Sequence, residues 1–194
     1  MLPLTAVLAY VSADTWFPIS ATNSTPLGGG GSAAADLLRA FPAPVLSSVG
    51  CGRIIDEVGV MVQTAALNEE VRIGLYLDDG NGYPGDLLVD FGAMSVSTVG
   101  KKTLAASEGI DCGDGPLWAA IWQSSGSKLV GMPPASFGPA LGAMSSFSTE
   151  LVVGWESSQG YTPGVSVLPA TYPAGAAKLQ HNSGFVPTYF VHFE

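Results

Sequence analysis

The fold of this chain is constrained most by a strict alternation of apolar with polar or small residues, which is followed directly by a run of turn-forming residues. Val71, Ile73, Leu75 and Leu77 occupy every second position of one stretch, which is the period of a β-strand with one buried face. The next residues, Asp78 to Asp86, read D-D-G-N-G-Y-P-G-D. Gly, Asn, Asp and Pro are the residues that tight turns use. The pattern therefore predicts antiparallel strands joined by short turns.

The same alternation recurs along most of the chain. From Ile54 to Gln63 we expect the even-numbered residues, Asp56 among them, on one face of a strand, and the odd-numbered residues on the other. Further strands are expected at Leu87–Phe91, Met94–Thr98, Lys101–Ala105, Leu117–Gln123, Ser145–Glu150, Leu151–Glu156 and Val186–Glu194. Short strands spaced roughly ten residues apart predict an all-β fold, a jelly-roll-like antiparallel β-sandwich with an extended N-terminal arm.

The first 48 residues differ from the rest. We expect residues 1–48 to form an N-terminal docking arm with a Gly-rich hinge at Gly28–Gly31, and residues 49–194 to form the sandwich domain. Ala33–Phe41 is expected to make a short helix that Pro42 ends. The first basic residue is Arg39, so we interpret the N-terminus as mature chain and not as a secretory signal. An arm of this kind can add a strand to a neighbouring subunit. Its apolar anchors are Leu2, Leu4, Leu8, Tyr10, Trp16 and Phe17.

The charge content excludes several functions. Seven basic residues against 16 acidic ones give a net charge of −9, which disfavours binding to nucleic acid. The hydrophobic share of 47% argues against intrinsic disorder. Uninterrupted apolar runs are much shorter than the roughly 20 residues that a membrane helix needs. Charged residues make up only 12% of the chain, about half the usual share, which favours a chain that is packed in an assembly or lives outside cells.

Catalytic patterns are weak. The chain has two histidines, His181 and His192, and contains no Gly-x-Ser-x-Gly motif. We interpret His192, in the terminal strand, as a satisfied edge-strand residue. The neighbours Asp56 and Glu57 point to opposite faces of a strand unless a bulge intervenes, so they do not suggest an acid–base pair. We therefore predict no catalytic residue.

The acidic turn and the cysteines leave alternatives open. Oxygen ligands crowd Asp78–Asp86 densely enough for calcium, but EF-hand spacing starting at Asp79 would put Tyr83 at a ligand position and Pro84 at the glycine position. The simpler interpretation is that these carboxylates cap backbone amides of the turn. Cys51 and Cys112 form no zinc motif, and are either separate thiols or one disulfide. We predict no metal and no cofactor.

Aromatic residues offer packing and, alternatively, sugar binding. Trp118 and Trp122 have the same parity in one expected strand, so they lie on one face, where core packing explains them. Trp155 and Tyr161 flank a polar loop and are the better candidates for an exposed glycan platform.

The stretch V-R-I-G-L-Y-L-D-D-G-N-G-Y-P-G-D-L-L-V-D-F-G, Val71–Gly92, resembles a domain of bacteriophage virion proteins of the tail-fibre or minor structural type. The resemblance covers roughly residues 50–194. It implies a β-sandwich that assembles on a virion, and it implies no catalytic residue and no cofactor. Its supporting segments are Lys101–Leu104, Pro116–Gln123, Gly160–Val165, Leu168–Pro173 and Tyr189–Phe193.

Together these features predict a non-enzymatic bacteriophage structural protein on the virion surface, as a head decoration, head fibre or tail fibre subunit. Its expected partners are other capsid or tail subunits, with a homotrimer expected by analogy with fibre and decoration proteins. The first alternative is a receptor- or glycan-binding module of a phage tail that contacts a host-surface glycan. The second is a secreted carbohydrate-binding domain.

Overall fold

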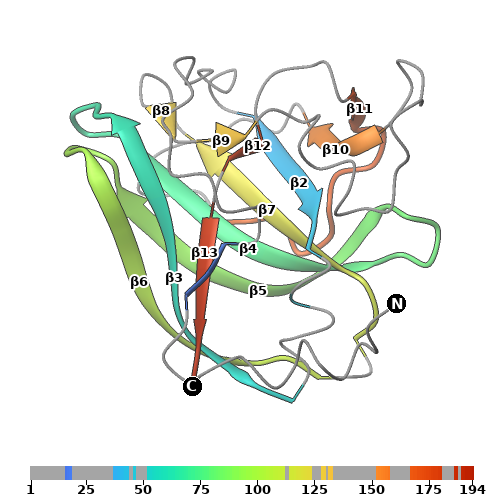
Figure 1. The fold of residues 1–194 in the computed structure, drawn as a ribbon. Helices are drawn as coiled ribbons and strands as arrows, with labels where there is room; N and C mark the ends of the chain where they lie inside the picture. The colour runs from blue at the N-terminus through green and yellow to red at the C-terminus, as the bar shows by residue number, and fades with distance from the viewer. Residues whose placement is uncertain are drawn as a thin grey trace, which may run out of the picture.

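The computed structural model describes residues 16–18, 37–43, 46, 52–111, 114–123, 128–129, 131–132, 152–157, 167–180, 186–187 and 189–194. These residues form two antiparallel β-sheets, which Figure 1 shows as two layers. The predicted all-β class and antiparallel pairing are confirmed, and the layered sheets agree with a β-sandwich. The jelly-roll connectivity stays a prediction.

The first sheet has the strand order β1-β13-β3-β6, and β8 also pairs with β3. Each neighbouring pair is antiparallel. Its strands are β1 (Trp16–Pro18), β3 (Ile54–Thr64), β6 (Gly100–Gly109), β8 (Lys128–Leu129) and β13 (Tyr189–Phe193).

The second sheet has the strand order β11-β10-β2-β7-β4-β5. Its strands are β2 (Leu38–Pro42), β4 (Glu70–Asp78), β5 (Pro84–Ser95), β7 (Leu117–Gln123), β10 (Val152–Ser157) and β11 (Ala177–Gln180). A separate small pair joins β9 (Gly131–Met132) to β12 (Val186–Pro187).

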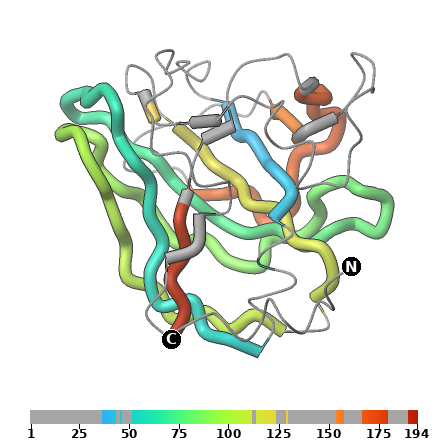
Figure 2. Tube along the Cα trace, viewed as in Figure 1, coloured from blue at the N-terminus to red at the C-terminus, as the bar shows by residue number. Residues whose placement is uncertain are grey.

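The main hydrophobic core fills the space between the two sheets, which the chain trace in Figure 2 shows as separate layers. Both sheets contribute aliphatic side chains to it, and their alternate residues face it. Its most deeply buried members include Ile55, Val58, Val60, Val71, Leu75, Val96 and Phe193. Burying this much apolar surface is the main stabilising term of such a fold.

Strand β7 has the bounds expected for Leu117–Gln123, lies inside the sheet and is buried on both faces. Leu117, Ala119 and Ile121 belong to the core between the sheets. Trp118 and Trp122 point to the opposite face, where they join a second apolar cluster. The expectation that the two tryptophans share one face and serve packing is confirmed.

A segment that we call the strap, residues 167–176, covers this outer face. It begins beside β5, where the Leu87 amide donates to Ala170 O and the Tyr172 amide donates to Gly85 O, both at 2.8 Å. Leu168 and Tyr172 of the strap are buried in the second cluster. The strap runs directly into β11 at the other end of the sheet. The sheet is therefore apolar on both sides because the strap replaces solvent on one of them.

Gly74 of β4 lies beneath the strap, and the close approach explains why it is glycine. A Cβ at this position would lie 2.3 Å from Leu168 Cδ1 and 2.6 Å from Val89 O. Any larger residue would force both the strap and β5 to move.

The helix expected at Ala33–Phe41 is wrong over its second half, because Leu38–Pro42 is strand β2. β2 pairs with β7 on one side and with β10 on the other. Leu38 and Ala40 are fully buried. Tertiary pairing overrides a weak local preference here. The second sheet thus includes residues from the span expected to be an arm.

Two strands expected after the turn, Leu87–Phe91 and Met94–Thr98, are in fact one strand up to Ser95, because β5 continues through Gly92 opposite β4. The strand expected at Ser145–Glu150 lies outside the described residues.

The face assignment in β3 is wrong at its start, because the register shifts there. Ile55 pairs with Phe193 and Glu57 pairs with His192, so Asp56 is an extra residue relative to β13. Ile55 and Val58 both face the core, whereas Ile54 is 43% exposed. An extra residue in one strand is a β-bulge, which reverses the inward and outward positions beyond it.

Candidate functional site

The edge of the first sheet is where the predicted arm meets the body. Strand β1 pairs antiparallel with β13, and Phe17 lies opposite Val191. Trp16 and Phe17, two of the expected anchors, therefore lie in a sheet. The other four, Leu2, Leu4, Leu8 and Tyr10, lie outside the described residues.

Strand β13 is held firmly in the first sheet by contacts that do not involve β1. It pairs with β3 at five positions from Tyr189 to Phe193. Val191 and Phe193 are 2% and 1% exposed in the main core. The Glu194 amide also donates to Ile54 O at 2.9 Å. The acceptor edge for β1 is thus built by the body itself.

His192 of β13 is within hydrogen-bond distance of the bulged Asp56 of β3. Its Nδ1 lies 2.5 Å from Asp56 Oδ1, and the two side chains are 15% and 38% exposed. The bulge is what turns the Asp56 carboxylate toward the imidazole. The prediction of a partnered His192 is confirmed, and the pair ties β13 to β3. His181 lies outside the described residues.

Six aromatic residues from distant parts of the chain gather on the outer face of the second sheet, and we call them the aromatic cluster. Its rings meet mostly edge to face, with centroids 5.4 Å apart for Tyr76 and Tyr172 and 5.8 Å apart for Tyr83 and Tyr172, a favourable aromatic geometry. The six are Tyr76, Tyr83, Trp118, Trp122, Trp155 and Tyr172.

Three tyrosine hydroxyls of the aromatic cluster fasten the strap. Tyr76 donates to Pro169 O at 2.8 Å, and Tyr83 donates to Pro173 O. The Tyr172 hydroxyl lies 3.0 Å from both Leu38 O and Trp155 O. Burial raises the pKa of Tyr76 and of Tyr172 far above the ordinary 10.0. Both hydroxyls therefore stay protonated and remain donors across the physiological range.

Trp155, predicted as half of a glycan platform, is built into this cluster. Its Nε1 donates to Gly82 O at 3.1 Å. The Tyr83 ring lies 4.7 Å away, and Lys178 Nζ lies 5.9 Å from the indole centroid. Packing and a cation–π contact thus account for much of its surface. Its proposed partner Tyr161 lies outside the described residues.

The carboxylates of the Asp78–Asp86 turn accept hydrogen bonds from the turn itself. Asp78 Oδ1 accepts from the Gly80 amide at 2.8 Å, and Asp79 Oδ1 accepts from the Asn81 amide at 2.7 Å. Gly80 and Gly82 adopt φ of +88° and +79°, which favours glycine. The interpretation of these side chains as amide caps is confirmed for Asp78 and Asp79.

The backbone hydrogen bond from Asn81 holds the pKa of Asp79 below its ordinary value of 3.8. A lowered folded-state pKa means that Asp79 stabilises the fold above that value and loses this effect as the pH falls through the folded pKa. We expect the stability difference between wild type and Asp79→Asn to be larger at pH 6 than at pH 3. Urea unfolding at both pH values measures it.

The control for that experiment is Glu69→Gln, which removes a carboxylate at the other end of β4. A difference between wild type and Asp79→Asn that stays constant from pH 6 to pH 3 would contradict the role given to Asp79.

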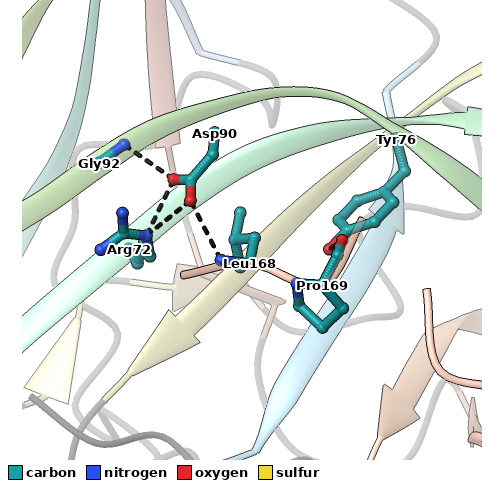
Figure 3. Close-up of polar contacts among 6 residues, drawn as sticks. All are labelled: Arg72, Tyr76, Asp90, Gly92, Leu168 and Pro169. Atoms are coloured by element: carbon teal, nitrogen blue, oxygen red, sulfur yellow. Dashed lines mark hydrogen bonds and ion pairs between the residues drawn. The ribbon is translucent and has the colours of Figure 1, made fainter. Parts of the chain in front are cut away.

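A charged node on β5, which the sequence analysis did not single out, anchors the beginning of the strap (Figure 3). Asp90 accepts from Arg72 Nε at 2.8 and 2.9 Å, from the Gly92 amide at 2.9 Å and from the Leu168 amide at 3.0 Å. Each of the two charged side chains is 17% exposed. The only sequence signal for this node is a lone acid inside the apolar run L-L-V-D-F.

Three of the segments that carry the resemblance to virion proteins meet around the strap. Val71–Gly92 supplies β4, the turn and most of β5, and Pro116–Gln123 supplies β7. Trp118 Nε1 donates to Asp78 Oδ2 at 2.8 Å, which joins β7 to the turn. Leu168–Pro173 is the part of the strap that the tyrosines hold. These three segments thus form one contiguous structural unit, whereas Gly160–Val165 lies outside the described residues.

Within the residues that the structure describes, no three His, Cys, Asp or Glu side chains gather closely enough to hold a metal ion. Over that same part of the chain, no helix has the length and apolarity to cross a bilayer. Cys51 and Cys112 lie outside it, so their pairing stays open.

Comparison of the chain with protein-family models, with curated proteins and with solved structures found no match in any of the three.

Proposed function

We propose that this chain is a non-enzymatic structural subunit of a bacteriophage virion, displayed on the surface of the head or tail. Its N-terminal residues attach it to capsid or tail subunits, and copies of the chain associate with one another, as a trimer by analogy with fibre and decoration proteins. The body is the exposed part.

The pairing of β1 with β13 is the observation that carries this proposal. A short strand from the predicted arm is bound at a sheet edge through main-chain pairing at three positions. Strand addition is a general way to attach one chain to another, because it satisfies backbone groups whatever the partner's side chains are. It is therefore suited to a subunit that must be gripped by its neighbours.

The construction of the body supports a role in display. Two ion pairs fix charged side chains within the second sheet: Arg39 with Glu156, and Arg72 with Asp90. The described Asp78 and Asp79 carboxylates are engaged by the turn. These groups serve the fold, and a body whose charged side chains are held in place fits a repeated surface unit.

The experiment compares purified particles made with the full chain, with a chain lacking residues 2–31, and with Trp155→Ala. We expect the full chain in gradient-purified particles and at least a tenfold lower copy number for the deletion. The deletion protein should still unfold cooperatively, because both described apolar clusters are built from residues 38–193. Trp155→Ala should be incorporated like wild type.

Absence of the full chain from the particles, or equal incorporation of the deletion, would overturn the proposal. Loss of binding to host-surface glycan by Trp155→Ala, with stability and incorporation unchanged, would instead favour the recognition module.

A further inference from the structure

Strand β1 occupies the outer position of the first sheet, and its acceptor does not depend on it. The five pairs with β3, the buried Val191 and Phe193, and the His192–Asp56 side-chain contact all hold β13 in place from the other side. Removing β1 would therefore leave a formed edge with unpaired main-chain groups. Such an edge is a template for any strand that can reach it.

The chain between β1 and the rest of the body is long enough to reach a second molecule. Residues 19–36 join Pro18 to Leu37 and include four consecutive glycines. A fully extended chain of that length spans about 60 Å. A compact domain made of residues 37–194 has a diameter of only about 40 Å. The connection therefore allows β1 to pair with its own β13 or with that of an adjacent copy.

We propose that in the assembled protein β1 of one copy pairs with β13 of a second copy, in the register Trp16–His192, Phe17–Val191 and Pro18–Phe190. This inference deepens the proposed function, because it identifies the partner at the arm-binding edge as another copy of this chain. The same contacts form within one chain or between two, so exchange loses none of them. Where copies stand side by side, each exchanged strand links two of them and adds avidity.

The register supplies a direct test with single-cysteine chains. Pro18 and Phe190 lie opposite each other, and directly opposed Cα atoms in an antiparallel pair are about 4.5–5.5 Å apart. That separation is within the range of a disulfide. Both substitutions leave the His192–Asp56 pair intact. The background carries Cys51→Ser and Cys112→Ser, so that no native thiol competes.

The decisive sample mixes two chains, one carrying only Pro18→Cys and the other only Phe190→Cys, tagged to differ in mass and oxidised after joint refolding. Because each chain carries a single cysteine, a disulfide between positions 18 and 190 can form only between two molecules. We expect a mixed covalent dimer at least tenfold more abundant than with Phe17→Cys in place of Pro18→Cys. Phe17 is the adjacent residue and pairs with Val191, so a cysteine there is out of register with position 190.

The double variant Pro18→Cys/Phe190→Cys completes the test. Its disulfide within single chains, with no mixed dimer from the two single variants, would show that β1 stays on its own body and would overturn the proposal. Failure of both samples, with wild-type melting retained, would overturn the pairing of β1 with β13 itself. A mixed dimer from a chain that is absent from virions would leave the exchange standing and remove the virion function.

Discussion

Asp90→Ala should lower the free energy of unfolding by about 3 kcal/mol and release the beginning of the strap. The substitution leaves the Arg72 guanidinium without its carboxylate in a mostly buried place, and it orphans the Leu168 and Gly92 amides. Breaking one side of a buried ion pair costs about 3–5 kcal/mol. The 17% exposure of both side chains places the expected loss at the lower end of that range. Urea unfolding measures the stability, and hydrogen exchange of the Leu168 amide reports on the strap.

Two matched variants separate the charged node from the rest of the strap. Asp90→Asn keeps an acceptor oxygen and should cost about half as much. Asp86→Ala, also on β5, removes only the exposed hydrogen bond from Thr171 Oγ1 and should cost less than about 1 kcal/mol. Equal losses in Asp90→Ala and Asp86→Ala would contradict the central place given to Asp90.

Trp118→Ala should destabilise the protein by about 3–5 kcal/mol, which is the usual cost of deleting a large buried aromatic side chain. Trp118 is 7% exposed at the centre of the second cluster, and its Nε1 holds Asp78 of the turn. The variant would therefore open a cavity under the strap and free the turn carboxylate together. The midpoint of urea unfolding measures this loss.

Trp118→Phe isolates the two contributions. It keeps a buried aromatic ring but removes the indole N–H and part of the ring volume, so we expect a loss of about 1–2 kcal/mol, smaller than that of Trp118→Ala. If Trp118→Phe were as destabilising as Trp118→Ala, the hydrogen bond to Asp78 and not the packing would dominate this position.

Both substitutions act on the body, and neither touches the β1–β13 edge. The second sheet packs apolar side chains on both faces, because the strap and the tyrosines that hold it cover the outer one. In the first sheet, by contrast, β13 has an edge with which β1 pairs. This difference between the two sheets fits a subunit with a stable body and an N-terminal strand that a neighbour binds.

The sequence alone determined the fold class and the position of its best-patterned strands. The alternation in Val71–Leu77 identifies β4, because a strand buried on one face has an apolar residue at every second position. The nearly continuous apolar run Leu117–Gln123 identifies β7, because a strand buried on both faces is apolar at consecutive positions. The turn Asp78–Asp86 was equally clear, since its Gly, Asn and Asp residues satisfy the turn's own amides. These are local effects, and local patterns record them.

Tertiary structure decided the features that depend on partners distant in sequence. Leu38–Pro42 is an inner strand because β7 and β10 pair with it on either side. The pattern of those five residues does not indicate these partners. The bulge at Asp56 reversed the faces of β3 and aimed a carboxylate at His192, 136 positions away. In the sequence Asp90 is an isolated acid within an apolar run, whereas in the fold it binds Arg72 and the strap. In each case the free energy comes from a contact between segments that the fold brings together, which a pattern within one segment does not encode.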